Sequence, residues 1–282
     1  MRAAPVLALI LLGSALLAGC TSQAGAPLKQ GRIVPGDPVA PDNPGWAPLE
    51  SAKIRPGALI HTPKADCPAN FVFIRPDNTS VFVGTTAYCV RDMHVGSLAS
   101  IGTNDTIAVL IYSSFETMAE VHETDADALN YNDFAVFRVD DRDRKWVNPA
   151  MLHYGGPVGL ADFGAVSVGE RVRSYANLSD GLPEALHARQ GVVAAQVGSW
   201  AYMVYGEPTL PGQMGAGVTT PDGKAVGVMI TLGVAPNPGA NGVARLDKLM
   251  EYADEHAKLH MTLMTWDLLA SGGIGSTQSS QS

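Results

Sequence analysis

Residues 211–230 read PGQMGAGVTTPDGKAVGVMI, and this stretch decides the fold. A Gly-rich turn at Gly212–Gly217 leads into a short β-type run at Val218. A second turn, Pro221–Lys224, separates it from the apolar run Ala225–Ile230. Pro and Gly clusters between apolar runs are typical of strands joined by tight turns. The stretch therefore predicts a loop, a strand, a turn and a second strand.

Short β-type runs separated by turn signals continue along the chain from residue 58 onward. They are Phe71–Ile74, Val81–Gly84, Ile107–Tyr112, Phe134–Val139, Arg171–Tyr175, Gly191–Val197 and Val226–Thr231. This spacing favours an antiparallel barrel or sandwich over alternating βα units. One helix is predicted at Arg245–His256, because apolar residues recur there at i, i+3, i+4 and i+7: Leu246, Leu249, Met250 and Ala253.

The loop–strand–turn–strand order resembles that of chymotrypsin/trypsin-like serine proteases, whose motif reads Gly-Asp-Ser-Gly-Gly-Pro-Val. In this chain Gln213 replaces the Asp and Met214 replaces the nucleophilic Ser. Ala216 replaces a Gly, and Gly217 replaces the Pro. The family's loop therefore keeps its glycine-rich shape here without its nucleophile.

Two further segments carry the same resemblance, in the family's order. Residues 81–89, VFVGTTAYC, resemble the apolar strand that ends in Thr-Ala-Ala-His-Cys, with Tyr88 where the general-base His is expected. Residues 132–139, NDFAVFRV, resemble the Asp-Ile-Ala-Leu segment and keep its acid as Asp133. The resemblance spans roughly Gly57 to Thr262. It implies an all-β, trypsin-like double six-stranded antiparallel β-barrel with a C-terminal α-helix.

The residues at the triad-equivalent positions lack the family's chemistry. The thioether of Met214 carries no proton to lose and forms no useful acyl intermediate. A phenol, as at Tyr88, has a reference pKa near 10 and cannot relay a proton as imidazole does. Asp133 would then orient nothing. The backbone of Gly212 and Met214 could preserve an oxyanion hole, but no intact catalytic set is expected.

Two outcomes are open for the Asp133 carboxyl. Backbone or hydroxyl donors could keep it ionised, or desolvation could raise its pKa. We expect the first, because the segment retains an acid beside the apolar run Phe134–Phe137.

Other chemistry finds little support. None of the seven His residues lies in a recognisable motif, although His94 and His153 are candidates for a relocated base. No metal-binding or phosphate-loop motif occurs, so no metal or cofactor is expected. The acidic residues between Glu116 and Asp127 predict a solvated loop rather than a calcium site. Met203, Met214 and Met229 are either adaptable side chains near the former cleft or ordinary core residues.

The N-terminus predicts export and lipid anchoring. Residues 1–19 combine Arg2 with the apolar stretch Val6–Leu17, which is too short for a stable membrane span. Residues 17–20, LAGC, match a bacterial lipobox, in which the cleavage site lies directly before a Cys that is diacylated, here Cys20. The alternative is an ordinary secretory signal followed by an accidental cysteine.

The two remaining cysteines, Cys67 and Cys89, form an even pair in an oxidising setting. A hairpin between them would bring both ends together, and many members of the resembled family have a bridge here, so we expect a disulfide rather than two buried thiols. Loss of Arg2 with the signal reduces 19 Lys and Arg to 18, against 27 Asp and Glu, a net charge of about −9. This charge disfavours nucleic acid as a partner.

The expected organisation has six parts. These are a lipoprotein signal (1–19), a Pro/Gly-rich tether (20–50), a first barrel lobe (51–148), a second barrel lobe (149–243), a C-terminal helix and last strand (244–268) and a disordered tail (269–282).

The expected function is a serine-protease homologue without catalysis, held at the extracytoplasmic face of the cell membrane by lipid on Cys20 and binding a protein or peptide. The alternatives are an active extracytoplasmic serine-type peptidase or hydrolase with non-standard residues, and a purely structural envelope lipoprotein.

Overall fold

The computed structural model describes residues 46–63, 65–75, 80–162, 164, 166–178, 187–206, 212–231 and 239–265. The expected signal segment, Cys20, most of the tether and the C-terminal tail lie outside the described residues. Within the described ranges, no helix combines the length and the apolar character that crossing a membrane requires.

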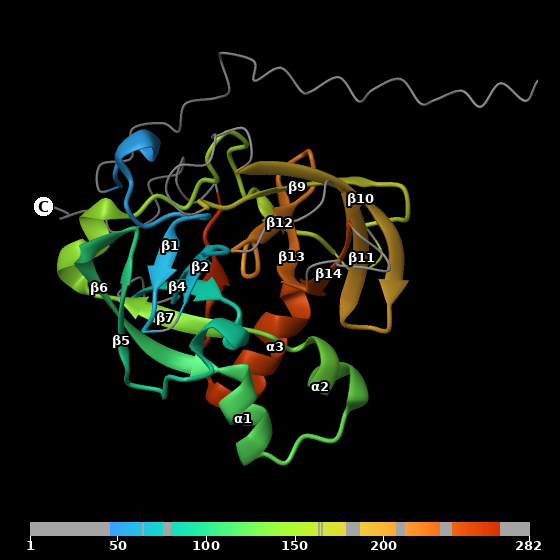
Figure 1. Ribbon diagram of the computed structural model, residues 1–282, viewed down its shortest axis with the longest axis horizontal. Coiled ribbons are helices and arrows are strands. Elements are labelled where there is room, and N and C mark those ends of the chain that lie inside the picture. Colours follow the sequence, from blue (N-terminus) through green and yellow to red (C-terminus); the bar gives the residue numbers. More distant parts are fainter. Residues whose placement is uncertain are drawn as a thin grey trace, which may run out of the picture. The chain divides into compact units, whose positions relative to one another are not determined.

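The first sheet is antiparallel and curled (Figure 1). Its eight strands run in the order β15-β3-β4-β7-β6-β5-β1-β2. Their bounds are β1 Leu59–His61, β2 Asp66–Pro68, β3 Val72–Ile74, β4 Val81–Thr85, β5 Leu98–Ile101, β6 Thr103–Ser113, β7 Ala135–Val139 and β15 Thr262–Leu263. The last strand thus returns from the C-terminal end of the chain to pair with β3.

The second sheet closes on itself. Strands β12-β9-β10-β11-β14-β13 form a ring because β13 also pairs with β12, and β8 adds to β13 in parallel. Their bounds are β8 Gly159–Leu160, β9 Arg171–Tyr175, β10 Ala188–Val197, β11 Ala201–Gly206, β12 Gly217–Thr219, β13 Lys224–Thr231 and β14 Ala240–Arg245. A closed six-stranded barrel beside a curled sheet, with a C-terminal helix, confirms the predicted fold class.

Consecutive apolar residues occur in the central strands β4 and β7, up to the exposed Arg138 in β7, because both faces of these strands are covered. In β4, Val81 and Val83 point into the interior of the first sheet, whereas Phe82 points into a second core. Val136 and Phe137 of β7 divide in the same way. Successive strand residues point to opposite faces, so such runs mark strands that are covered on both sides.

The second core joins the two sheets and α3 (Leu246–Ala257). Its centre is aromatic, with Phe134 stacked edge-on against Phe73 at 6.0 Å and tilted against Tyr112 at 6.2 Å between ring centroids. The second sheet contributes Ala225, Val228, Ile230 and Ala244, and the helix contributes Leu246, Leu249, Tyr252 and Ala253. The helix predicted at residues 245–256 is therefore present, and its apolar face is covered as expected.

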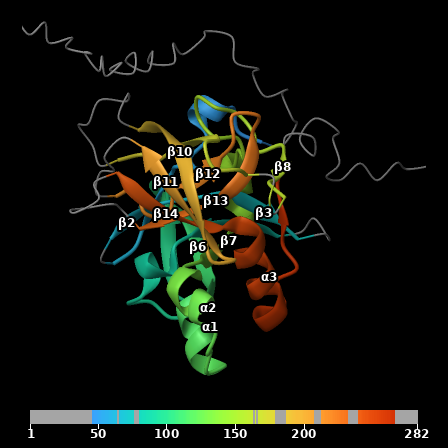
Figure 2. The same cartoon turned by 90° about the vertical axis from the view of Figure 1, so that its right-hand side faces the viewer.

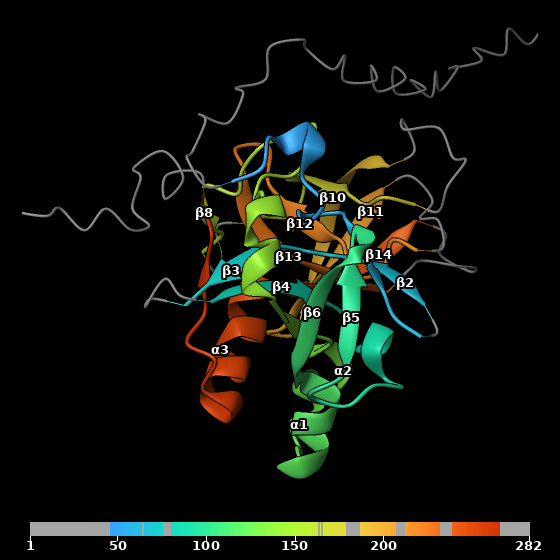
Figure 3. The same cartoon turned by 90° about the vertical axis from the view of Figure 1, so that its left-hand side faces the viewer.

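The acidic stretch between Glu116 and Asp127 is not the solvated loop that the sequence predicts. It contains two short helices, α1 (Ser114–Glu120) and α2 (Ala126–Tyr131). Helix α1 continues directly from β6 and contacts α3 (Figures 2 and 3). The Asp125 side chain caps α2 by accepting hydrogen bonds from the N–H groups of Asp127 and Ala128 at 2.8 and 3.0 Å.

Two of these acids also bond to distant parts of the chain. Glu123 accepts a hydrogen bond from the Tyr252 hydroxyl on α3 at 2.9 Å. Asp127 accepts one from the Ser199 N–H, in the turn between β10 and β11, at 3.1 Å. The helical insert therefore links the first sheet to α3 and to the second sheet.

The predicted disulfide between Cys67 and Cys89 is confirmed, with the two Cα atoms 6.2 Å apart. One detail of the expectation is wrong, because the strand before Cys89 ends at Thr85. Cys89 lies instead on the 3-10 helix η2 (Ala87–Val90). Since the Cys89 sulfur carries no hydrogen, the Thr86 hydroxyl donates to it at 3.0 Å. The bridge therefore ties η2 to β2.

Candidate functional site

Asp133 lies two residues before β7, and Ser114, at the start of α1, bonds to both of its neighbours. The Ser114 hydroxyl donates to the Asn132 carbonyl at 2.7 Å and accepts from the Phe134 N–H at 3.0 Å. Ser114 is fully buried, and its own N–H donates to the Phe134 carbonyl at 2.8 Å. Both neighbours of Asp133 are thereby fixed. Sequence reasoning missed this role, although a Ser-Ser pair before a Glu-containing segment is typical of a helix start.

The Asp133 carboxylate is bound by the backbone of η2. Its Oδ1 accepts a hydrogen bond from the Tyr88 N–H at 2.8 Å, and the Ala87 N–H also hydrogen-bonds the carboxylate. Only 8% of the residue is exposed. The backbone donors expected from the sequence are therefore present.

The expectation for the Asp133 pKa is nevertheless wrong. Desolvation by burial raises this pKa to about 6, because it outweighs the two backbone N–H groups, which lower it. The carboxyl borders the apolar core between the sheets, where the charged form loses most of its hydration.

The Tyr88 side chain lies at the surface, against Arg91. It is 46% exposed, and the guanidinium carbon of Arg91 lies 4.2 Å from its ring centroid. A hydrogen bond with the Tyr88 side chain raises the pKa of Arg91 above its usual value. Tyr88 thus contacts Asp133 through its backbone N–H and Arg91 through its side chain.

The loop that carries Met214 reaches the first sheet through Gly215. A Cβ atom on Gly215 would lie 2.7 Å from Thr85 Oγ1 and 2.8 Å from the Pro68 carbonyl oxygen. The Thr85 hydroxyl itself donates to that carbonyl at 3.0 Å. Since Thr85 ends the strand that leads to Tyr88, the loop and η2 meet at one place. Met214 is half-buried there, as the residue before Gly215.

The backbone of this loop adopts a conformation that requires glycine at two positions. Gly212 has φ +93° and Gly215 has φ +103°, a region that side chains rarely adopt. The Gly215 N–H donates to the Met229 carbonyl at 2.8 Å, which anchors the loop to β13. Whether the backbone of Gly212 and Met214 forms an oxyanion hole stays a prediction.

The other candidate residues described in this paragraph are paired at the surface or packed in the second barrel. His94 is paired with Glu116 at 2.8 Å on the surface, and His61, His256 and His260 are also paired with carboxylates. Met229 is buried in the second barrel, and Met203 is half-buried on β11. Among the described residues, no group of His, Cys, Asp and Glu side chains is arranged to hold a metal ion.

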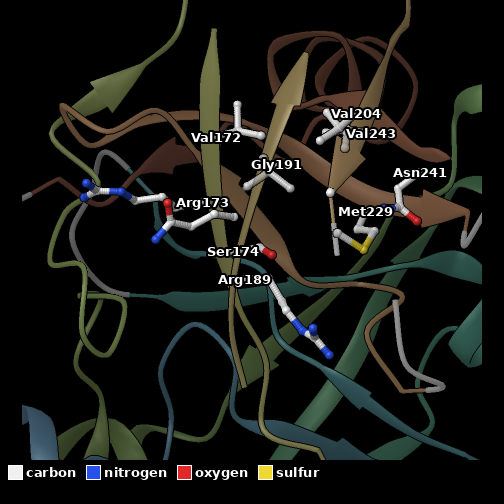
Figure 4. Close-up of a pocket in the computed structure, with 12 residues that line it drawn as sticks. Val172, Arg173, Ser174, Arg189, Gly191, Val204, Met229, Asn241 and Val243 are labelled. Atoms are coloured by element: carbon white, nitrogen blue, oxygen red, sulfur yellow. The ribbon is translucent and has the colours of Figure 1, made fainter. Parts of the chain in front are cut away.

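A small cavity inside the second barrel is too small for a peptide side chain (Figure 4). Its volume is about 20 Å³, which suits about one water molecule. Its apolar walls include Val172, Val204, Val218, Met229 and Val243. Polar residues, among them Ser174, Arg189 and Asn241, also line it.

Comparison with known proteins assigns the fold. No protein-family model matches the sequence, and no curated protein matches it. Protease A of Thermobifida fusca has a similar structure at 14% identity, with a TM-score of 0.51 over 75% of this chain and 98% of that protein. A glutamic acid specific serine protease, described as using a novel histidine triad in substrate binding, is similar at 13% identity and a TM-score of 0.50, over 75% and 100% of the two chains.

The chain therefore has the fold of chymotrypsin/trypsin-like serine proteases. At identities this low, the similarity shows a shared fold only. The chemistry of the site has to be argued from the residues of this chain. In that architecture Tyr88, Asp133 and Met214 come from the three segments that the sequence singled out.

The raised pKa of Asp133 predicts a specific pH dependence for Asp133→Asn. Because the folded pKa of about 6 lies above the model value of 3.8, burial favours the protonated acid. The stability contributed by this group is fully present below pH 3.8 and is lost as the pH rises through 6. Relative to the unmodified protein, Asp133→Asn should thus gain up to about 3 kcal/mol between pH 4 and pH 7. Denaturant unfolding at both pH values measures this gain.

Asp133→Ala is the matched control, because it removes the charge and also the acceptor of two N–H groups. It should be about 1–3 kcal/mol less stable than Asp133→Asn at either pH. An equal stability difference between the unmodified protein and Asp133→Asn at pH 4 and pH 7 would contradict the account.

The contact between the loop and the first sheet predicts different costs for two Gly→Ala changes. Gly212 and Gly215 have similar positive φ values, so both changes carry backbone strain of about 1–2 kcal/mol. Only Gly215→Ala also drives a methyl group into Thr85 and Pro68, whereas at Gly212 the nearest atom is Leu178 Cδ2 at 3.6 Å. Gly215→Ala should therefore destabilise the protein by at least about 1 kcal/mol more. Equal unfolding free energies for the two variants would refute the close approach.

Proposed function

We propose that this chain is a membrane-tethered serine-protease homologue without triad-dependent catalysis, and that it binds a protein or peptide at the cell surface. One observation carries the proposal: the Asp133 carboxylate is engaged by backbone N–H groups of η2, while the Tyr88 side chain at the base position lies against Arg91. A triad needs the acid to orient a base that titrates near neutrality. Here the acid orients a helix backbone instead.

The nucleophile position supports the same conclusion. Met214 stands on a loop whose Gly215 packs against the first sheet as closely as a backbone can. The loop therefore retains its place while its side chain offers a thioether, which cannot serve as an acyl acceptor. Chemistry is lost at two positions, and the surrounding architecture is kept at both.

A binding role follows from what is kept. The disulfide fixes η2, which places Tyr88 at the surface with its ring against Arg91. Tyr and Arg are two of the three residue types that are enriched at the hot spots of protein interfaces. The expected lipid on Cys20 would hold this surface at the extracytoplasmic face of the membrane.

The non-catalytic proposal predicts no turnover of a broad peptide library by the unmodified protein. Met214→Ala should behave identically, because Met214 supplies no nucleophile. Tyr88→His/Met214→Ser restores both missing groups, and any recovered cleavage should require both changes. Product formation followed by mass spectrometry measures all of these activities.

Each single variant serves as a control for the double variant. Met214→Ser alone should stay inactive for want of a base, and Tyr88→His alone for want of a nucleophile. Robust cleavage by the unmodified protein, whether or not Met214→Ala removes it, would support an active hydrolase with other residues.

The anchoring part of the proposal predicts that the protein partitions with membranes through Cys20. Cys20→Ala should give an unprocessed or soluble product, because two or three acyl chains on one residue provide stable anchoring that a bare N-terminus lacks. Membrane fractionation together with intact-mass analysis tests this. An unmodified Cys20 at the mature N-terminus would exclude a lipid anchor.

A further inference from the structure

The second barrel carries a row of three exposed side chains on neighbouring strands. Val192 of β10 pairs with Arg171 of β9 on one side and with Tyr205 of β11 on the other. The three strands are adjacent in the second sheet (Figure 1). Residues that lie directly opposite each other on paired strands share one face of the sheet. Arg171, Val192 and Tyr205 are here called the β10 row.

The neighbours of the β10 row along each strand show that the row faces outward. Val172, Val193 and Val204 each lie directly beside one of its members, and all three belong to the apolar interior of the second barrel. Because successive side chains of a strand point to opposite faces, the row points away from that interior. Its valine is 38% exposed and its tyrosine 45%, and its arginine is exposed as well.

The β10 row has no partner among the residues that the structure describes. None of its three side chains forms a hydrogen bond, an ion pair or a ring contact there. A guanidinium therefore lies at one end of the row and an aromatic ring at the other, with an apolar side chain between them. Arg and Tyr are residue types that are enriched at the energetic centres of protein interfaces. The composition of the row is thus that of an interface.

The order of the three residues makes the row complementary to a second copy of itself. Neighbouring strands lie about 4.8 Å apart, so Val192 is midway between Arg171 and Tyr205. A twofold axis parallel to β10, above Val192, would bring two rows face to face with Val192 against Val192. Arg171 of each copy would then oppose Tyr205 of the other, and a guanidinium over a Tyr ring is a favourable cation–π contact. Two sheets packed face to face in this way lie about 10 Å apart, which leaves room for these side chains.

A comparable row on the first sheet lacks this complementarity. Val109 of β6 pairs with Leu98 of β5 and with Arg138 of β7, and both of these neighbours are exposed. The same twofold arrangement would place Arg138 of one copy against Leu98 of the other. An aliphatic side chain offers a guanidinium neither a π face nor a negative charge. The choice of surface therefore falls on the β10 row.

We propose that this chain forms a homodimer through the β10 row, with Arg171 of each copy stacked on Tyr205 of the other. The contact is isologous, so it is complete in a dimer and does not propagate into longer assemblies. It uses the outer face of β9, β10 and β11 and none of the residues of the candidate site. The proposal is independent of whether the chain cleaves peptides or binds another protein.

Sedimentation velocity of the purified protein in mild detergent, over a wide range of protein concentrations, tests the proposal. The unmodified protein should show a reversible equilibrium between monomer and dimer. Val192→Asp places two carboxylates face to face at the centre of the contact and should weaken dimerisation at least about tenfold. Tyr205→Arg places guanidinium groups opposite each other and should weaken dimerisation as well.

Exchanging the two outer residues tests the pairing itself. The double variant Arg171→Tyr/Tyr205→Arg keeps one Arg and one Tyr in each row, so the same pairs can form across the twofold axis. It should dimerise more tightly than Tyr205→Arg alone. Leu98→Asp is the matched control, because it puts the same charge as Val192→Asp on an exposed strand position of the other sheet. This variant should dimerise as the unmodified protein does.

Monomers at every concentration would overturn the proposal and leave another protein as the occupant of this face. Dimers that survive both Val192→Asp and Tyr205→Arg would overturn it too, as would dimers that only Leu98→Asp dissociates. Failure of the double variant to dimerise more tightly than Tyr205→Arg would contradict the pairing of Arg171 with Tyr205. Tyr205→Arg keeps the test decisive if Val192→Asp does not fold.

Discussion

The contact of Gly215 with Thr85 and Pro68 is the constraint on which the site depends. It brings the loop of the second barrel against the end of β4, with no room for a side chain between them. Thr85 then leads into η2, and the Cys67–Cys89 bridge ties η2 to β2. The Asp133 carboxylate also holds η2, because it accepts hydrogen bonds from backbone N–H groups of η2. None of these links uses the side chain of Tyr88 or Met214. The arrangement of the backbone around Tyr88 and Met214 therefore does not depend on these two side chains.

Much of this arrangement could be predicted from local sequence. The strands of the apolar runs, the helix after β14 and the disulfide follow from periodicity, turn residues and cysteine arithmetic. The segments of Tyr88, Asp133 and Met214 resemble segments of the protease family because the residues around each of the three positions match the family's sequence pattern. These features depend on residues close together in the chain, and short-range patterns report them well.

What could not be predicted depends on contacts between distant residues. The pKa of Asp133 is raised by its burial in the folded chain, and no local pattern reveals that burial. The sequence does not reveal that α1 and α2 replace a solvated loop, because Glu123 and Asp127 bond to Tyr252 and Ser199, far along the chain.

The central claim is that the fold of a serine protease is kept here without a reactive nucleophile. Its most direct test is incubation of the unmodified protein with a serine-directed fluorophosphonate probe, followed by intact-mass measurement. A covalent adduct forms only where a hydroxyl is activated by a neighbouring base. The account predicts an unchanged mass after prolonged incubation, and a stoichiometric adduct on the unmodified protein would contradict it.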